Sequence, residues 1–174
     1  MEITKYGVTL RKLTVEKIEM LRNWRNDPKI VQYMEYKEYI TPEMQQKWFE
    51  KINNIYNFFF IIVVDNKEIG LINVRDIDYD KAEGEAGIYI YDDNSYNSTI
   101  SFQATFALYD FCFENLKLNR TIAHILKDNK RAIKYNKLIG YKIAINQENV
   151  NNQLYYLQKD DYISSRENFI QLFN

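Results

Sequence analysis

The chain has 174 residues with a formal net charge of −1 at pH 7, and 46% of the residues are hydrophobic. A chain of this length buries roughly two-thirds of the surface that its unfolded form exposes, so neither a disulfide nor a metal ion is needed for folding. The near-zero charge and the lack of a basic run argue against nucleic acid as a partner, and one His with one Cys cannot form a zinc cage.

Nothing in the sequence divides the chain, because Gly and Pro total only seven and no repeat or linker is visible. We therefore expect a single domain over residues 1–174. The N-terminus lacks an apolar signal core and no stretch approaches the roughly 18 apolar residues of a membrane span. These features predict a cytoplasmic protein without membrane contact.

The N-terminal part predicts one strand and two helices. Val8 to Leu10 is a short strand candidate, and Thr14 is expected to cap a helix that runs through Trp24 and ends at Asn26-Asp27-Pro28. Thr41-Pro42-Glu43 starts the second helix with a capping residue and a proline at the first helical position. The fourfold spacing on this helix predicts three core residues, Met44, Trp48 and Ile52.

The middle of the chain predicts a sheet. The apolar run from Phe58 to Val64 turns at Asp65-Asn66-Lys67 into a second strand from Ile69 to about Ile77. A third strand runs from Glu85 to Tyr91 and is followed by a polar loop. A long helix follows, with a buried stripe predicted at Phe102, Phe106, Tyr109 and Phe113.

The C-terminal part predicts a strand over 121–126, a short helix, and two more strands over 141–145 and 154–158. Asp128 or Asn129 is expected to cap the helix, and Gly140 to end it in the left-handed conformation. This order predicts an α/β (α+β) fold with a mixed central sheet of about six to seven strands flanked by helices.

Three segments resemble the GNAT acyltransferase superfamily, in the RimJ/RimL-like branch that includes PseH-type amino-sugar N-acetyltransferases. D-N-K-R-A-I-K-Y-N-K-L-I-G-Y (128–141) is similar to the family's N-x-x-A-I-x-x-Y-x-K-x-G-F segment. R-N-W-R-N-D-P (22–28) with K-W-F-E (47–50) resembles the opening helices of the amino-sugar branch. A-G-I-Y-I (86–90) resembles the family's central strand. The resemblance implies the GNAT fold and an acetyl-CoA-dependent transfer of an acetyl group to a primary amine, by direct attack on the thioester.

The resemblance also implies a set of site residues. Those for the cofactor, acetyl-CoA, are Ile88, Tyr89, Ile90, Asn97, Ser98, Thr99, Ile100, Ser101, Asn129 and Lys137. Catalytic roles fall on Glu85, Tyr135 and Asn136, and the acceptor site on Trp24, Arg25 and Asn26. No metal site is expected. Each also has a structural alternative: Glu85 as a surface carboxylate at a strand start, Asn129 as a helix cap, Lys137 as a solvated lysine, and Trp24 as the packing of a helix end.

Two positions depart from the family pattern. Where the family has a glycine-rich G-K-G stretch for the pyrophosphate, this chain has Asn97-Ser98-Thr99, and the β-branched Thr99 would resist a positive φ. Where the family has a tyrosine that protonates the departing thiolate, this chain has Asn136, with Tyr135 one residue earlier and about 100° around the helix.

The sequence leaves three acceptor classes and one function without catalysis open. R-N-W-R-N-D-P favours a nucleotide-linked amino sugar as the acceptor, whereas the acidic stretch over 76–83 suits a polyamine, and the RimJ/RimL likeness suits a protein N-terminus. The two departures instead favour a GNAT-shaped module without catalysis. A small-molecule amine is the expected partner, and a homodimer is a further possibility.

Overall fold

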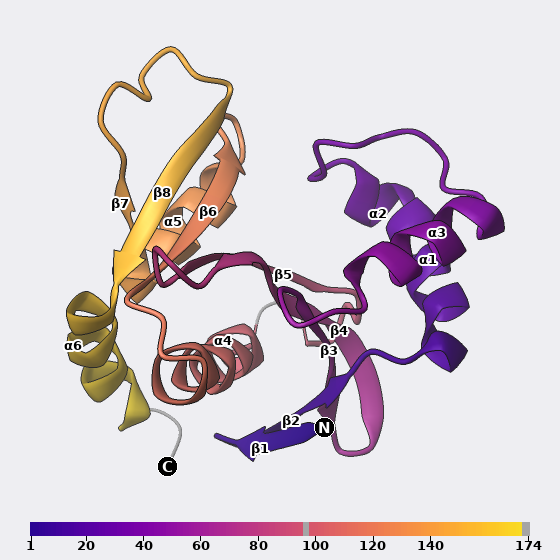
Figure 1. The fold of residues 1–174 in the computed structure, drawn as a ribbon, viewed down its shortest axis with the longest axis horizontal. Coiled ribbons are helices and arrows are strands. Elements are labelled where there is room, and N and C mark those ends of the chain that lie inside the picture. Colours follow the sequence, from indigo (N-terminus) through magenta and orange to yellow (C-terminus); the bar gives the residue numbers. More distant parts are fainter. Residues whose placement is uncertain (96–97, 172–174) are drawn as a thin grey trace.

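The computed structural model describes residues 1–95 and 98–171 and contains one eight-stranded sheet with helices on both faces (Figure 1). The sheet exceeds the predicted six to seven strands because Glu2–Lys5 forms an additional edge strand, β1, paired with β2 (Val8–Lys12). The mixed α/β class is confirmed.

The sheet order is β1-β2-β3-β4-β5-β6-β8-β7. The central strands are β3 (Phe58–Val64), β4 (Lys67–Asp78), β5 (Glu83–Ile90) and β6 (Arg120–Leu126), followed by β8 (Asn152–Gln158) and the two-residue β7 (Lys142–Ile143). All neighbours are antiparallel except β5 and β6, which are parallel.

The helices form two groups around the sheet. One group contains α1 (Ile18–Asn26), preceded by a 3-10 turn (Val15–Lys17), with α2 (Pro28–Val31) and α3 (Pro42–Ile52). The other contains α4 (Ile100–Asp110), its π-helical extension (Phe111–Asn115), α5 (Lys130–Ile139) and α6 (Lys159–Ile170). In Figure 1 the first group lies to the right, whereas α5 lies beside β6 and β8 on the left.

The strand β3 shows why the sheet core is apolar on both faces. Alternate side chains point to opposite faces, so Phe60 and Ile62 join the core under α4 while Phe59 and Ile61 join the core under α1 and α3. A strand covered on both sides reads as a continuous apolar run, which is the pattern that predicted it.

Several helix predictions are confirmed and two are wrong. Asn129 caps α5 by accepting from the Ala132 amide at 3.0 Å, and Gly140 ends it with φ of +111°. Thr14, however, makes no side-chain capping bond, because the 3-10 turn intervenes before α1.

The predicted inward face of α3 is also wrong. Gln45 and Phe49 are its buried residues, while Met44 is exposed and Trp48 and Ile52 are only partly buried. The fourfold spacing is real, but the buried stripe is centred one residue later, where Phe49 meets α1 and the sheet.

A buried carboxylate holds the C-terminal helix against the rest of the fold. Asp110 on α4 is 3% exposed and accepts from Lys5, from Tyr6 at 2.7 Å, and from Tyr162 and Arg166 of α6 at 2.6 Å each. Desolvation alone would raise the pKa of Asp110, but these hydrogen bonds outweigh it and hold the pKa below its ordinary value. Three segments distant in sequence, the N-terminal hairpin, α4 and α6, are therefore joined by one charge.

Replacement Asp110→Asn should lower the free energy of unfolding at pH 7 by about 3 kcal/mol, because Lys5 and Arg166 lose their buried partner. A depressed carboxylate pKa stabilises the fold above the unfolded-state value of about 3.9 and ceases to do so as the pH falls through the folded-state value. The gap between wild type and variant, measured by urea unfolding, should therefore close below about pH 4. Glu114→Gln is the matched control, since Glu114 meets the same two cations but is 55% exposed.

Candidate active site

The sheet splits between β5 and β6. The two strands pair over only three residues, from Glu83 with Arg120 to Glu85 with Ile122. Beyond that point β5 stays paired with β4 as far as Ile90, and β6 stays paired with β8 as far as Leu126. The facing edges of β5 and β6 therefore diverge and, within residues 1–95 and 98–171, have no strand partner.

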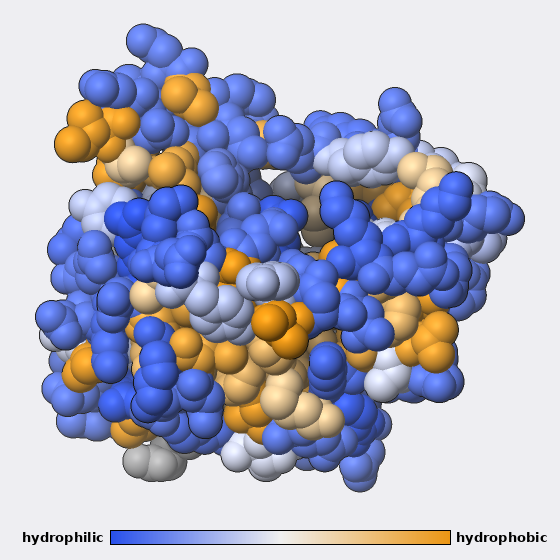
Figure 2. All heavy atoms as spheres, in the orientation of Figure 1, coloured by the Kyte–Doolittle hydropathy of each residue, from blue (hydrophilic) through white to orange (hydrophobic). Residues whose placement is uncertain are grey.

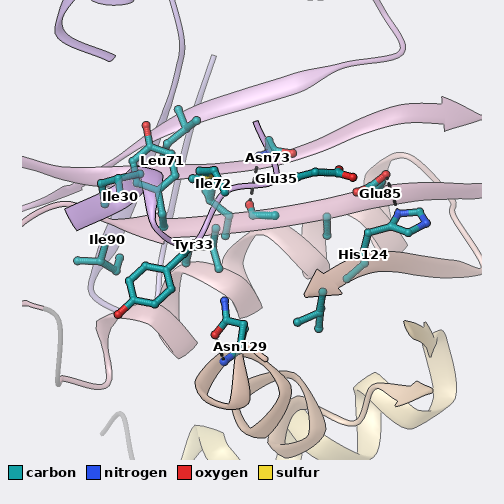
Figure 3. Close-up of a pocket in the computed structure, with 18 of the residues that line it drawn as sticks. Ile30, Tyr33, Glu35, Leu71, Ile72, Asn73, Glu85, Ile90, His124 and Asn129 are labelled. Carbon is teal, nitrogen blue, oxygen red and sulfur yellow. Dashed lines mark hydrogen bonds and ion pairs between the residues drawn. The ribbon is translucent and has the colours of Figure 1, made fainter. Parts of the chain in front are cut away.

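A cavity of about 720 Å³ lies at this split. Its volume falls in the usual range for small-molecule sites. Residues from α1, α2 and the loop that follows form one wall, and residues from β6 and α5 form the other. Figure 2 shows a hollow in the surface between these two parts of the molecule, and Figure 3 shows the side chains that converge there.

The predicted cofactor residues divide into two sets. Ile88, Tyr89, Ile90, Ser101 and Asn129 line the cavity. The described residues Ser98, Thr99, Ile100 and Lys137 do not line it, and Asn97 lies outside the described residues. Asn129 combines the confirmed capping role with a place in the cavity wall, at the N-terminal end of α5 (Figure 3).

At the start of α4, the Ser98 hydroxyl makes hydrogen bonds with the backbone. Ser98 Oγ donates to the Ser95 carbonyl at 2.6 Å and lies 3.3 Å from the Ile100 amide. Thr99 has φ of −72°, an ordinary helical value, so its β-branched side chain is not strained there.

Tyr135 and Asn136 both line the cavity from α5. The Tyr135 hydroxyl donates to the Ser101 carbonyl at 2.9 Å and lies 2.6 Å from Thr105 Oγ1, and burial raises its pKa. The Asn136 amide donates to the Ala132 carbonyl at 2.9 Å. Of the two, Tyr135 alone carries an acidic hydroxyl, and its raised pKa keeps that hydroxyl protonated at neutral pH.

The R-N-W-R-N-D-P segment splits into residues that hold the fold and one that faces the cavity. Trp24 stacks on Tyr91 with ring centroids 5.0 Å apart, and Asn26 makes two hydrogen bonds with the Ile40 backbone. Neither lines the cavity, whereas Arg25 does.

Arg25 is a partly buried cation without a counter-ion. Its guanidinium lies 5.4 Å from the centre of the Trp48 ring, and no carboxylate among the described residues pairs with it. Desolvation lowers the pKa of Arg25. By contrast, two other basic residues that line the cavity are paired: Lys29 with Asp93 at 3.0 Å, and Arg75 with Glu85 at 2.6 Å.

Glu85 belongs to a charged cluster that the sequence did not reveal. One carboxylate oxygen accepts from Arg75 of β4 at 2.6 Å, and the other lies 3.3 Å from His124 Nδ1 on β6 (Figure 3). Its side chain is 16% exposed, so the surface alternative does not describe it. The sequence does indicate that His124 points away from the core, because it alternates along the strand with the apolar Ala123 and Ile125. Only the pairing of β5 with β6 brings it beside Glu85.

Two buried polar atoms on the same sheet face lack hydrogen-bond partners within the described chain, Asn73 Oδ1 and Tyr89 Oη. The Asn73 amide lies across the neighbouring strand and donates to the Gly87 carbonyl at 3.3 Å. A Cβ at position 87 would lie only 3.3 Å from that amide nitrogen, so glycine makes room for it. Unpaired buried polar atoms are rare and are typical of functional sites.

Comparisons with known proteins agree with this geometry. A GNAT acetyltransferase domain model matches residues 8–142. The chain is 30% identical over 124 residues to acetyltransferase PseH of Campylobacter jejuni subsp. jejuni serotype O:23/36 (strain 81-176), covering 71% of this chain and 75% of PseH.

Solved structures show the same fold. FdhC, described as a nucleotide-linked sugar GNAT, superposes with a TM-score of 0.83 at 16% identity, covering 100% of this chain and 99% of FdhC. Spermidine N-acetyltransferase from Vibrio cholerae, in complex with CoA and spermine, superposes with a TM-score of 0.75 at 19% identity, covering 90% and 98%. The chain therefore belongs to the GNAT family and is an N-acetyltransferase with acetyl-CoA as its co-substrate.

Proposed function

We propose that this enzyme acetylates the primary amine of a nucleotide-linked amino sugar. The observation that carries the proposal is Arg25, a partly buried guanidinium in the cavity wall with no carboxylate partner among the described residues. An uncompensated buried cation is costly, and a phosphate accepts two parallel hydrogen bonds from a guanidinium. A diphosphate linker in the acceptor would supply the missing charge.

The structural likeness to FdhC supports this acceptor class. A polyamine is the second candidate, supported by the likeness to the spermidine enzyme and by two carboxylates of the cavity wall, Glu35 and Glu85. Glu85 is already engaged by Arg75, and Glu35 accepts from Asn152 at 3.1 Å. Arg25 would repel a polycation, so the anionic acceptor is the better match.

The residues at the split fit acetyl-CoA. The edge of β5 that carries Ile88 to Ile90 has no partner beyond Glu85, so an extended pantetheine arm can add to it as a strand would. Bound there, acetyl-CoA supplies an acetyl group activated as a thioester. The backbone of Ile88 and Ile90 would orient it, Asn129 would contact its amide, and Glu85 takes part in removing the proton of the acceptor amine.

We expect acetyl-CoA to raise the melting temperature of the protein. A ligand at 100 times its dissociation constant adds about 2.7 kcal/mol to the free energy of unfolding, which corresponds to about 5–10 °C for a domain of this size. Differential scanning fluorimetry with calorimetry measures both quantities, and adenosine is the control ligand. Failure to bind at millimolar acetyl-CoA would contradict the fit at β5.

Tyr135 is proposed to protonate the departing thiolate from its place in the cavity wall. Tyr135→Phe should then lower kcat by about 100-fold while the KM for acetyl-CoA changes little, since loss of a general acid affects only the chemical step. Thr105→Val is the control, because it removes a partner of the hydroxyl but leaves the acid in place. Equal loss in both variants would assign Tyr135 to the support of α4 and α5 alone.

Arg25→Gln should raise the KM for a nucleotide-linked amino sugar by about 10- to 100-fold with little change in kcat, because a charge-assisted hydrogen bond contributes about 1.5–3 kcal/mol. The KM for the same amino sugar without its nucleotide should not change. Lys29→Gln, which removes a paired cation from the same wall, should leave both values unaltered.

The acceptor itself is tested by following CoA release with UDP- or dTDP-linked amino sugars and with spermidine. Turnover of spermidine alone would overturn the proposal and establish the polyamine instead. Unchanged kinetics of Arg25→Gln toward a nucleotide-linked sugar would show that the diphosphate binds elsewhere.

A further inference from the structure

The single histidine of the chain lies in the active-site cavity. His124 lies on β6, lines the cavity, and places Nδ1 3.3 Å from Glu85 Oε2 (Figure 3). Its side chain is 38% exposed, so the imidazole is only partly covered by protein. His124 does not belong to the apolar core, because its neighbours Ala123 and Ile125 are the residues of this strand segment that pack there.

The pairing of β5 and β6 explains why these two residues meet. Glu85 and Ile122 are the last paired positions before the strands diverge. His124 follows Ile122 by two residues and so points to the same face of the sheet. The imidazole thus lies just past the point of divergence, where it reaches back to the carboxylate at the end of the paired segment.

Arg75 fixes the carboxylate in this contact. Its Nη2 donates to Glu85 Oε1 at 2.6 Å, which leaves Oε2 for His124. An ionised carboxylate only accepts hydrogen bonds, so we assign the imidazole tautomer with the proton on Nδ1, the nitrogen 3.3 Å from Glu85 Oε2. In the neutral imidazole the lone pair is then on Nε2, the nitrogen away from Glu85.

We propose that His124 is the catalytic base of this enzyme, with Glu85 and Arg75 as positioning residues. Nε2 takes one proton from the ammonium form of the acceptor, and the freed nitrogen lone pair forms the new C–N bond to the acetyl carbon. The C–S bond breaks and its electron pair leaves on the thiolate. The Tyr135 hydroxyl gives its proton to the thiolate, and the second amine proton replaces it on Tyr135. This inference depends on the amine acetylation stated above but not on the identity of the acceptor.

The chemistry of the cluster favours His124 over Glu85 as the proton acceptor. Both oxygens of Glu85 face cations or a donor, whereas an imidazole ordinarily titrates near neutral pH and works best as a base there. The other charged groups of the cavity wall are Arg25, Lys29, Glu35 and Arg131. Glu35 accepts from Asn152 and lies on the loop after α2, a different element from the cluster.

The presence of only one histidine makes a direct titration possible. The imidazole C–H signals in the proton NMR spectrum can come only from His124. Glu85→Gln should lower the midpoint of their titration, because the charged imidazole loses the carboxylate that lies 3.3 Å from its Nδ1. Glu83→Gln is the matched control: Glu83 lies on the same strand and is bound by Arg120, but does not line the cavity. An unchanged midpoint in Glu85→Gln would overturn the coupling.

Kinetics then test the role of the base. His124→Gln should lower kcat by about 100- to 1,000-fold and abolish the fall in kcat/KM at acid pH, while calorimetry shows unchanged acetyl-CoA affinity. Glu85→Gln should lower the pH midpoint of the fall in kcat/KM, and by the same amount as the midpoint of the NMR titration. Retention of the wild-type acid limb in His124→Gln, or a kinetic midpoint unrelated to the NMR midpoint, would overturn the proposal.

The two proposals can fail separately. The measurements use whichever primary amine the wild-type enzyme acetylates, so refusal of nucleotide-linked amino sugars would refute the proposed acceptor without affecting the His124 test. Melting temperatures of the variants show whether the fold is intact. Should His124→Gln unfold, the NMR titration of Glu85→Gln and its shifted acid limb still decide the assignment, since that variant retains the histidine.

Discussion

The early end of the pairing between β5 and β6 is the constraint on which the rest of the structure depends. Three parallel pairs join the two strands, and each strand then continues with its outer neighbour alone. The sheet consequently divides into two parts that are joined only by the three paired positions of β5 and β6. The cavity lies where the two parts separate. Because parallel strands are normally covered and fully paired, the unpaired edge of β5 marks the place where an extended ligand can complete the sheet.

The two faces of the sheet have different tasks. Towards α4, side chains such as Phe60, Ile72 and Phe106 form a dry core that holds both parts of the sheet together. Towards α1 and α3, the apolar cluster gives way near the split to polar and charged residues, among them Asn73, Arg75 and Glu85. Alternate residues of each strand point to opposite faces of the sheet. The same strands therefore place apolar side chains in the core on one face and polar side chains in the cavity on the other.

The N-terminal helices place a cation, Arg25, in the cavity wall, and no carboxylate among the described residues pairs with it. Arg22 and Asn26 both bind the Ile40 backbone and thereby anchor the loop that leads into α3, while Trp24 packs against Tyr91. Arg25 lies on the same helix as these residues, and their contacts hold it in the cavity wall. The cavity wall also contains a second charged cluster, which consists of Arg75, Glu85 and His124. The cavity wall therefore contains both the guanidinium of Arg25 and the imidazole of His124.

The sequence by itself determined the class of fold, most strand and helix positions, and several caps, because these depend on local periodicity and on residues such as Asn129 and Gly140 whose backbone roles are local. It also marked Arg25 and Glu85. It could not place the buried stripe of α3, which depends on where Phe49 meets α1, nor the addition of β1 and α6, which are held by Asp110. The pairing of Glu85 with His124 was decided only by tertiary structure, since 39 residues separate them along the chain and only the register of β5 on β6 brings them together.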